Sequence, residues 1–333
     1  HPVTESITAV DLVEWQLRAA AGESIPLAQA DIPMKGWAME ARLYAEDPAH
    51  GFLPSIGRLD HFVMPEDIRV DTGVMQGGEV SQFYDPMIAK LIVHEDSREA
   101  AAARLADACR QVEVWPVRTN AGFLARCLDH PRFIEGDVDT GFIAVEAAAL
   151  ETPEASPILL AEVANHALDR APPDREGASV WSSLAGAQGF RVNADPIRTV
   201  RLWLDDGQRD VVPASGLTYQ RTTIVHDDRI VGFENGIAHG FRDHAPISFG
   251  GSGSNSDGAL RAPMPGKIVA APVKAGDVVT KGQPVVVLEA MKMEHALVAP
   301  FDGVVASLDV AVGDQVTDGA VLAEVRAEVG AEG

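Results

Sequence analysis

The chain has 333 residues, of which 46% are hydrophobic and 6% aromatic, so it is long and apolar enough for two or three globular domains. Its formal net charge of −22 disfavours binding to nucleic acid or to an anionic membrane surface. Its apolar runs are far shorter than the roughly 18 residues of a membrane span. Two cysteines, Cys109 and Cys127, lack metal-ligand spacing, and with no signal sequence they predict a reducing compartment.

The first part of the chain, residues 1–150, mixes helical and strand-like patterns. Apolar residues recur at helical spacing near the start, and two later stretches, one of them rich in alanine, predict further helices. Between them lie runs that alternate as strands do. The expected helices are 11–18, 98–112 and 121–128, and the expected strands are 68–71 and 83–93.

Four motifs in this part occur in a recognisable order: HPVTE at 1–5, EARLYAEDP at 40–48, FLPS at 52–55 and YDPMIAK at 84–90. They resemble the C-terminal part of biotin carboxylase, the ATP-grasp enzyme that carboxylates biotin. In that family the catalytic glutamate, the ATP-binding lysines and the glycine-rich loop all precede the position of His1. We therefore expect a C-terminal fragment, which by itself neither binds ATP nor carboxylates biotin.

The resemblance implies one catalytic residue, Arg69. It falls where the family has an arginine that stabilises bicarbonate and the charge developing on the biotin oxygen, a task that suits a permanently charged planar fork. Taken alone, the alternating pattern indicates that Arg69 is the outward-facing residue of a strand. Lys90 and Asp85 are interpreted as structural. Glu40 and Arg42 lie two residues apart on one strand face, which predicts a buried ion pair.

The middle part, residues 151–245, begins with a break containing two prolines and continues as an amphipathic helix at 158–170. Several strand-like pieces follow and predict a barrel or curled sheet around that helix. Three scattered histidines are interpreted as satisfied or solvated, so no metal site is expected. The strand pieces are 189–192, 198–204, 221–226 and 229–233, and the histidines are His226, His239 and His244.

The last part contains an internal repeat, because residues 262–290 align without a gap with residues 299–327. Two copies predict a small two-fold domain of short antiparallel strands at 260–333. The segment between the copies must connect them, which predicts a hairpin with Lys292 at its tip. Met291 and Met293 flank this lysine, and large apolar residues at an exposed tip are typical of a binding surface.

In this setting Ala290-Met291-Lys292-Met293 resembles the modified segment of biotinyl domains, and 262–266 (APMPG) matches that family's opening motif. The resemblance implies covalent biotin on Lys292, attached by a biotin protein ligase, with Met291 and Met293 beside it. Lipoyl domains share the two-fold plan but typically carry Asp-Lys at the tip, so Met291 favours biotin. A Gly/Ser-rich stretch precedes the domain, and it predicts a flexible linker at 246–259 that lets the whole domain travel.

Taken together, the parts resemble the biotin-containing α subunit of an acyl-CoA carboxylase. The expected fold is multidomain α+β: a partial ATP-grasp C-terminal subdomain, a helix-plus-antiparallel β-barrel middle domain and an all-β biotinyl domain. By its position alone, 151–245 resembles the BT domain that docks the carboxyltransferase β subunit. The resemblance implies an α/β hetero-oligomer, and ATP, Mg and bicarbonate as co-substrates of the full-length subunit only.

The acyl group stays open. Glu294-His295 and the short middle part favour the 3-methylcrotonyl-CoA type, whereas 51–57 favours the propionyl-CoA type, and geranyl-CoA is a further alternative. The isolated chain could also act only as a non-catalytic biotin carrier and scaffold, or as a lipoyl carrier. The expected location is the cytoplasm of a bacterium, or the mitochondrial matrix if the source is eukaryotic.

Overall fold

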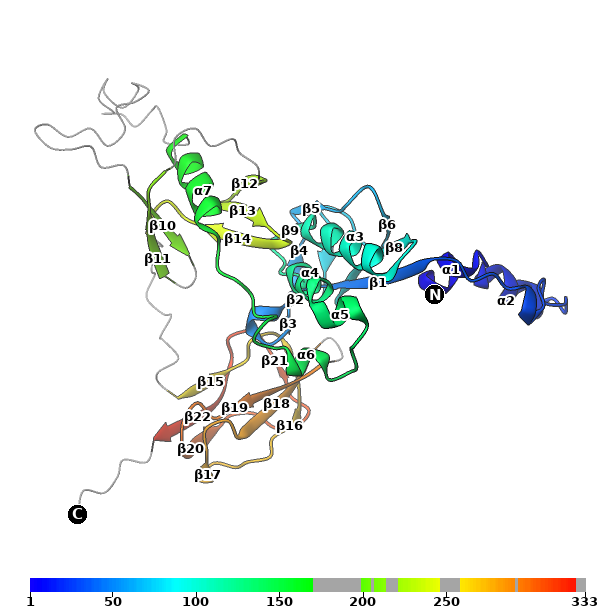
Figure 1. Cartoon of the computed structure of the whole chain (residues 1–333). Coiled ribbons are helices and arrows are strands. Elements are labelled where there is room, and N and C mark those ends of the chain that lie inside the picture. Colours follow the sequence, from blue (N-terminus) through cyan, green and yellow to red (C-terminus); the bar gives the residue numbers. More distant parts are fainter. Residues whose placement is uncertain (170–198, 205–206, 214–220, 246–257, 291–292, 328–333) are drawn as a thin grey trace, which may run out of the picture.

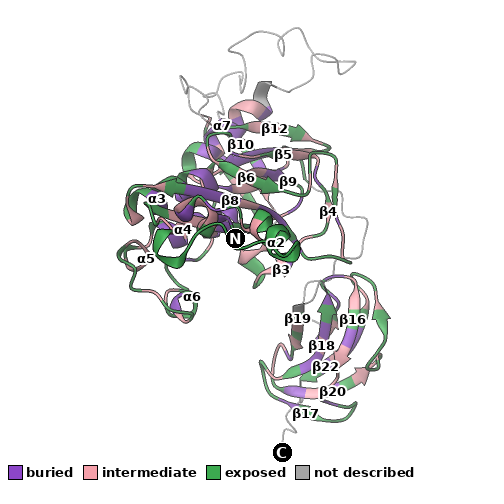
Figure 2. Cartoon of the chain, turned by 90° about the vertical axis from the view of Figure 1, so that its right-hand side faces the viewer, coloured by how far each residue is buried: buried purple, intermediate pink, exposed green. Residues whose placement is uncertain are grey.

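The computed structural model describes residues 1–169, 199–204, 207–213, 221–245, 258–290 and 293–327 (Figure 1). Within this part the hydrophobic side chains gather into separate cores for the first, middle and last parts of the chain. The buried residues lie along β8 in the first core and along β18 in the last (Figure 2). No helix in the described ranges is long and apolar enough to cross a membrane.

An antiparallel sheet in the order β1–β8–β6 organises the first part. One face packs on α3, where Leu91 and Val93 of β8 join Leu105 in the core. The helix starts at Ser97, whose hydroxyl accepts a hydrogen bond from the Ala100 N–H at 3.1 Å. The elements are α1 (Pro2–Thr8), α2 (Leu12–Ala20), η1 (Gln29–Asp31), β1 (Trp37–Tyr44), β2 (Glu46–Asp47), η2 (Pro48–His50), β3 (Leu53–Pro54), β4 (Gly57–Arg58), β5 (His61–Val63), β6 (Arg69–Thr72), β7 (Glu79–Val80), β8 (Met87–Glu95), α3 (Arg98–Arg110), β9 (Glu113–Trp115), α4 (Ala121–Asp129), α5 (Pro131–Glu135) and α6 (Phe142–Val145).

The predicted helices and strands of this part are present with shifted ends. The amphipathic helix near the start, α2, is capped by Asp11, which accepts hydrogen bonds from the backbone N–H groups of Val13 and Glu14. Its apolar face packs on nothing in the described structure, because Val13 and Leu17 remain 60% and 67% exposed. The amphipathic pattern therefore predicted the helix correctly without specifying a partner for its apolar side.

The middle part consists of one helix against antiparallel strands: α7 (Pro157–Asp169), β10 (Val200–Leu204), β11 (Gly207–Val211), β12 (Thr223–His226), β13 (Arg229–Glu234) and β14 (Ile237–Phe241). The sheets β10–β11 and β12–β13–β14 are joined by a bridge between Trp203 and Arg242. α7 lies close to β13, since a Cβ on Gly232 would come within 2.6 Å of Leu159. A curled sheet around the helix is thus present. Closure into a barrel is not seen among the described residues, and the expected strand at 189–192 lies outside them.

A polar cluster fixes the start of α7 to β13. The Glu234 carboxylate accepts hydrogen bonds from the Ser156 hydroxyl at 2.7 Å and the Ser156 N–H at 3.0 Å, and it pairs with Arg221 at 2.8 Å. Burial alone would raise the pKa of Glu234, but the Ser156 hydrogen bonds and the Arg221 charge bring it below its usual value. The cluster therefore contributes stability above the ordinary pKa of a glutamate and loses it at lower pH.

Replacing Glu234 by glutamine is expected to lower the free energy of unfolding by about 2–4 kcal/mol at pH 7, because charge-assisted bonds to a nearly buried carboxylate are lost. Urea denaturation followed by circular dichroism measures the change, with the exposed Glu151→Gln as control. As the pH falls and the Glu234 carboxylate becomes protonated, the difference between wild type and Glu234→Gln should shrink. A Glu234→Gln variant as stable as Glu151→Gln at pH 7 would contradict this role.

Several contacts join the first and middle parts, and two of them involve Trp115 and a hairpin tip. Trp115 of β9 lies beneath the guanidinium groups of Arg118 and Arg229, at 5.8 and 5.9 Å from the ring centroid. The β13–β14 hairpin turns at Asn235 and Gly236, both with positive φ, and its tip enters the junction of α3 and α4. These contacts hold the middle part against the carboxylase-like part. Figure 1 shows the β13–β14 hairpin next to the first part of the chain.

The last part is a two-fold sandwich: β15 (Ala259–Arg261), β16 (Gly266–Ala270), β17 (Val278–Val279), β18 (Pro284–Ala290), β19 (Met293–Val298), β20 (Gly303–Leu308), β21 (Gln315–Val316) and β22 (Val321–Ala327). Its sheets have the orders β15–β22–β20–β17 and β19–β18–β16–β21. The repeat extends to the register, because Ile268 pairs with Leu288 just as Val305 pairs with Val325, with a bulge following in both copies. The predicted two-fold domain is confirmed.

Candidate functional site

The β18–β19 hairpin carries the lysine that the sequence singled out. The two strands pair in register up to Ala290 and Met293, so two residues connect them. Those residues, Met291 and Lys292, lie outside the described structure, as does the side chain of Met293. Because the paired strands end on either side of it, Lys292 belongs to the connection and not to a strand. The described strands flank this lysine on both sides, and biotin attachment to it stays a prediction.

Side chains next to the connection are suited to hold a bound group. Glu289 and Glu294 are exposed and lie opposite one another in the register. His295 is half-buried, and its Nε2 is buried without a hydrogen-bond partner in the described structure. Burial lowers the pKa of His295, which favours the neutral ring. An orphaned donor or acceptor three residues from Lys292 is consistent with a polar group attached at the hairpin.

The second candidate residue, Arg69, lies on the polar face of the β1–β8–β6 sheet. Its Nε and Nη2 donate to the two oxygens of Asp71 at 2.9 and 2.8 Å, and its Nη1 reaches Glu5 of α1 at 3.3 Å. Hydrogen bonding to Asp71 raises the pKa of the Arg69 guanidinium. The side chain is 49% exposed. Arg69 is thus an outward, half-exposed strand residue, whose three nitrogens are held by the carboxylates of Asp71 and Glu5.

Neighbours of Arg69 form a charged row across the sheet. Lys90 lies opposite Arg42 on one side and Asp71 on the other, and its Nζ is 3.8 Å from Glu40. Arg42 also pairs with Glu40 at 3.2 Å, so the predicted ion pair forms. The expectation that it is buried was wrong, because the Arg42 side chain is 58% exposed. The strand pattern correctly predicted that Glu40 and Arg42 lie on the same face of the sheet. Where Arg42 lies, that face is exposed to solvent.

Sequence patterns gave no sign of an unusual carboxylate at Glu46. Burial, with the charge of Asp85 as a second cause, raises the pKa of Glu46 to about 7. Asp85 itself stabilises the turn before β8, accepting a hydrogen bond from the Met87 N–H at 3.0 Å, which agrees with its structural interpretation. The raised pKa of Glu46 depends on burial and on Asp85, which belongs to a different sequence motif. The pattern of apolar and polar residues within either motif could therefore not predict it.

A pH-dependent stability difference is expected for Glu46→Gln. Because the folded-state pKa exceeds the unfolded value, folding is favoured while Glu46 is protonated, and this contribution is lost as pH rises through about 7. Glutamine cannot ionise, so the variant should be more stable than wild type by about 1–3 kcal/mol at pH 8 and similar near pH 4.5. Denaturation midpoints at the two pH values measure this, and an equal difference at both would contradict it.

The three histidines singled out in the middle part have separate surroundings. His226 Nε2 lies 3.0 Å from Asp60, and His244 Nδ1 lies 2.8 Å from Asp243. Burial lowers the pKa of His239. Within the described ranges no cluster of histidine, cysteine and carboxylate side chains could hold a metal ion. The buried cysteines Cys109 and Cys127 have raised pKa values, about 12 and 11, because burial penalises the thiolate.

Comparison with known proteins identifies domain families in the first and last parts of the chain. Residues 40–145 match the family of biotin carboxylase C-terminal domains, and residues 258–325 match the family of biotin-requiring enzymes. The chain therefore contains a biotin carboxylase C-terminal domain and a domain of the biotin-requiring enzymes.

The chain is similar to α subunits of two kinds of acyl-CoA carboxylase. The chain is similar to the mitochondrial methylcrotonoyl-CoA carboxylase α subunits of Dictyostelium discoideum and Mus musculus, with 34% and 36% identity over 89% of this chain. It is also similar to the propionyl-CoA carboxylase α chain of Ruegeria pomeroyi, with 33% identity over 89% of this chain. These alignments cover 50%, 48% and 52% of the respective relatives, so the chain spans about half their length.

Proposed function

We propose that this chain is the biotin-carrying portion of an acyl-CoA carboxylase α subunit, with biotin attached to Lys292. The observation that carries the proposal is the pairing of β18 and β19 up to Ala290 and Met293, which leaves Met291 and Lys292 as the connection. Biotin would supply the ring nitrogen that accepts a carboxyl group derived from bicarbonate. Met291 and Met293 flank the attachment point and provide the apolar contacts recognised by a biotin protein ligase.

Arg69 is the residue proposed to act in the carboxylation step. Its guanidinium is charged at all working pH values, and it can bind bicarbonate and stabilise negative charge that develops on an oxygen atom. Asp71 holds two of its nitrogens and Glu5 reaches the third, which fixes the direction of the guanidinium. ATP, Mg and bicarbonate would bind only when the remaining half of the subunit length seen in the relatives is present, so residues 1–150 complete an active site without forming one alone.

The remaining assignments follow from the order of the parts. Residues 151–245 are proposed to dock a carboxyltransferase β subunit in an α/β hetero-oligomer. Residues 246–259, almost all outside the described residues, are proposed to link this part to the biotinyl domain at 260–333. The acyl-CoA is proposed to be 3-methylcrotonyl-CoA, supported by the similarity to methylcrotonoyl-CoA carboxylases. Propionyl-CoA is the second candidate, supported by the relative from Ruegeria pomeroyi. The location is proposed to be the cytoplasm of a bacterium, or the mitochondrial matrix of a eukaryote.

A carboxyl-transfer experiment tests the proposal. The biotinylated chain is incubated with radiolabelled bicarbonate, ATP and a separately purified, complete biotin carboxylase. Label should appear on the wild-type chain and be absent from Lys292→Arg, and it should not appear when the separate carboxylase is omitted. Adding a methylcrotonoyl-CoA carboxylase β subunit should move the label to 3-methylcrotonyl-CoA in preference to propionyl-CoA. A biotinylated wild-type chain that acquires no label would contradict the proposed function.

A further inference from the structure

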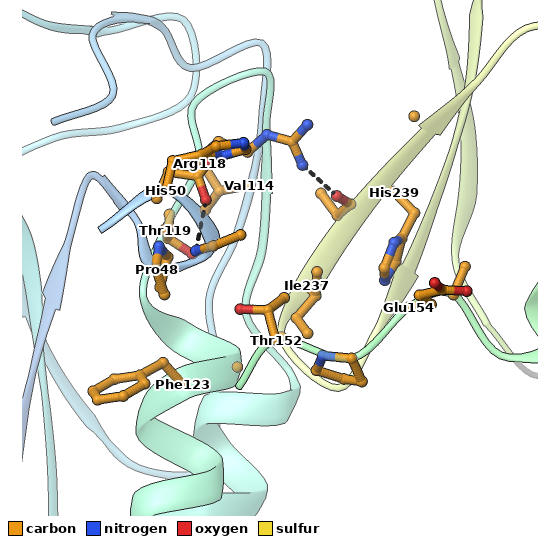
Figure 3. A pocket seen from close by; sticks show the side chains of 18 of the residues that line it. Pro48, His50, Val114, Arg118, Thr119, Phe123, Thr152, Glu154, Ile237 and His239 are labelled. Carbon is orange, nitrogen blue, oxygen red and sulfur yellow. Dashed lines mark hydrogen bonds and ion pairs between the residues drawn. The ribbon is translucent and has the colours of Figure 1, made fainter. Parts of the chain in front are cut away.

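A cavity of about 300 Å³ lies where the first and middle parts of the chain meet. Figure 3 looks into it: Phe123 of α4 approaches from one side, Ile237 and His239 of β14 from the other, and Thr152 and Glu154 belong to the segment that connects the two parts. The cavity is distant in sequence from Lys292 and includes no residue of the Arg69 sheet face. The functions proposed above make no use of it.

The cavity is lined by Arg126, which has an unusual environment. Its Nε donates to the Leu150 carbonyl at 3.2 Å, whereas its Nη2 is buried without a hydrogen-bond partner in the described structure. Burial lowers the pKa of Arg126, and no carboxylate of the described residues compensates. By contrast, the nearby Arg132 pairs with Asp137 and Glu146. The chain has 49 acidic residues, yet this partly buried guanidinium has no carboxylate partner among the described residues. Buried polar groups are normally paired, so the environment of Arg126 is unusual.

A partly buried cation is costly unless a counter-charge compensates it. Guanidinium groups pair best with planar oxyanions, to which they donate two parallel hydrogen bonds. The remaining walls are largely apolar, with Val117, Phe123, Leu160 and Ile237 among the lining residues. A ligand that satisfies both features has a carboxylate at one end and a short hydrocarbon body. The volume is at the small end for ligand sites, which limits the body to a few carbons.

Other charges on the walls narrow the ligand class further. Asp47 and Glu154 also line the cavity, and they would repel a dianion such as phosphate more strongly than a monocarboxylate. Arg118 and Arg209 line it too, but Arg118 Nη1 donates to the Ala238 carbonyl at 3.0 Å and Arg209 pairs with Glu154 at 3.8 Å. Arg126 is therefore the residue on which an anionic end would be centred.

We infer that this cavity is a binding site for a small aliphatic monocarboxylate, whose carboxylate pairs with Arg126 and whose hydrocarbon body packs between α4 and β14. Such a ligand would contact both parts of the chain at once, so binding would strengthen their junction. The inference concerns a site separate from biotin attachment and from Arg69, and it holds or fails independently of the proposed function.

Isothermal titration of the whole 333-residue chain tests this site with hexanoate and its neutral, equally shaped analogue hexanamide. Hexanoate should bind at least tenfold more tightly than hexanamide and should raise the thermal unfolding midpoint, while inorganic phosphate should do neither. Arg126→Gln should lose the preference for hexanoate. The matched control Arg132→Gln, which changes an arginine outside the cavity lining, should keep it.

The comparison of the two probes on the wild-type chain needs no variant, so it stands even if Arg126→Gln folds poorly. Arg126→Lys gives a second variant, which keeps the charge and loses the planar fork, and it should retain only part of the preference. Equal binding of hexanoate and hexanamide, no binding of either, or an unchanged preference in a folded Arg126→Gln chain would each overturn the inference.

Discussion

Replacing Lys292 by arginine is expected to abolish biotin attachment completely. Biotin protein ligase would form an amide with the ε-amine of this lysine, and the amine must give up its proton to react. A guanidinium keeps its proton at any working pH and is not acylated in its place. The chain is incubated with ligase, biotin and ATP, and streptavidin blotting then reports attachment.

The same domain offers a matched control for Lys292→Arg. Lys281 is an exposed lysine in the turn between β17 and β18, so Lys281→Arg changes a lysine of the same fold away from the hairpin. It should be biotinylated as fully as the wild type. Streptavidin binding by Lys292→Arg, or its loss in Lys281→Arg with the fold intact, would show that the modified residue was assigned incorrectly.

Replacing Gly236 by alanine is expected to release the middle part from the carboxylase-like part. Gly236 has φ of +74°, and a Cβ there would stand 2.5 Å from the Cys109 carbonyl oxygen and 3.0 Å from the Gly122 nitrogen. The positive φ costs a side chain roughly 1 kcal/mol, and overpacking against rigid backbone costs about 1–3 kcal/mol more. The free energy of unfolding should therefore fall by about 2–4 kcal/mol.

Gly51→Ala separates backbone strain from the clash. Gly51 has φ of +69° but nothing within 4 Å of its Cβ position, so only the strain of roughly 1 kcal/mol applies. Denaturation followed by circular dichroism gives the stabilities, and limited proteolysis between the two parts reports their separation. Gly236→Ala should be cleaved faster than both Gly51→Ala and the wild type. Equal stability and equal cleavage of the two variants would mean that the hairpin tip does not hold the parts together.

The sequence predicted the biotinyl domain in detail because its information is local and repeated. Matching glycines and aspartates at a fixed offset place each turn twice, and the strands between them follow. Even the bulge after Ile268 recurs after Val305. A hairpin between the copies was then required by connection alone. The carboxylase-like part was predicted from its motifs, and Arg69 from its place among them, with the structure adding Asp71 and Glu5 as its partners.

Other features depend on contacts between distant segments, and the sequence could not supply them. Glu46 acquires its raised pKa from burial and from Asp85, which lies in another motif. Arg126 is one arginine in an ordinary helical pattern, and its lack of a carboxylate is visible only in three dimensions. The strands β11 and β14 were missed because short polar strands such as 207–211 have weak alternation, and their pairing partners define them.

The measurement that tests the central claim most directly is peptide mapping by mass spectrometry of the wild-type chain. The chain is incubated with biotin protein ligase, biotin and ATP, and in parallel with a lipoate ligase, lipoate and ATP. We expect one biotinyl group, carried by the peptide that contains Lys292, and no lipoyl group. A lipoyl group on Lys292, or biotin on a different lysine, would contradict it.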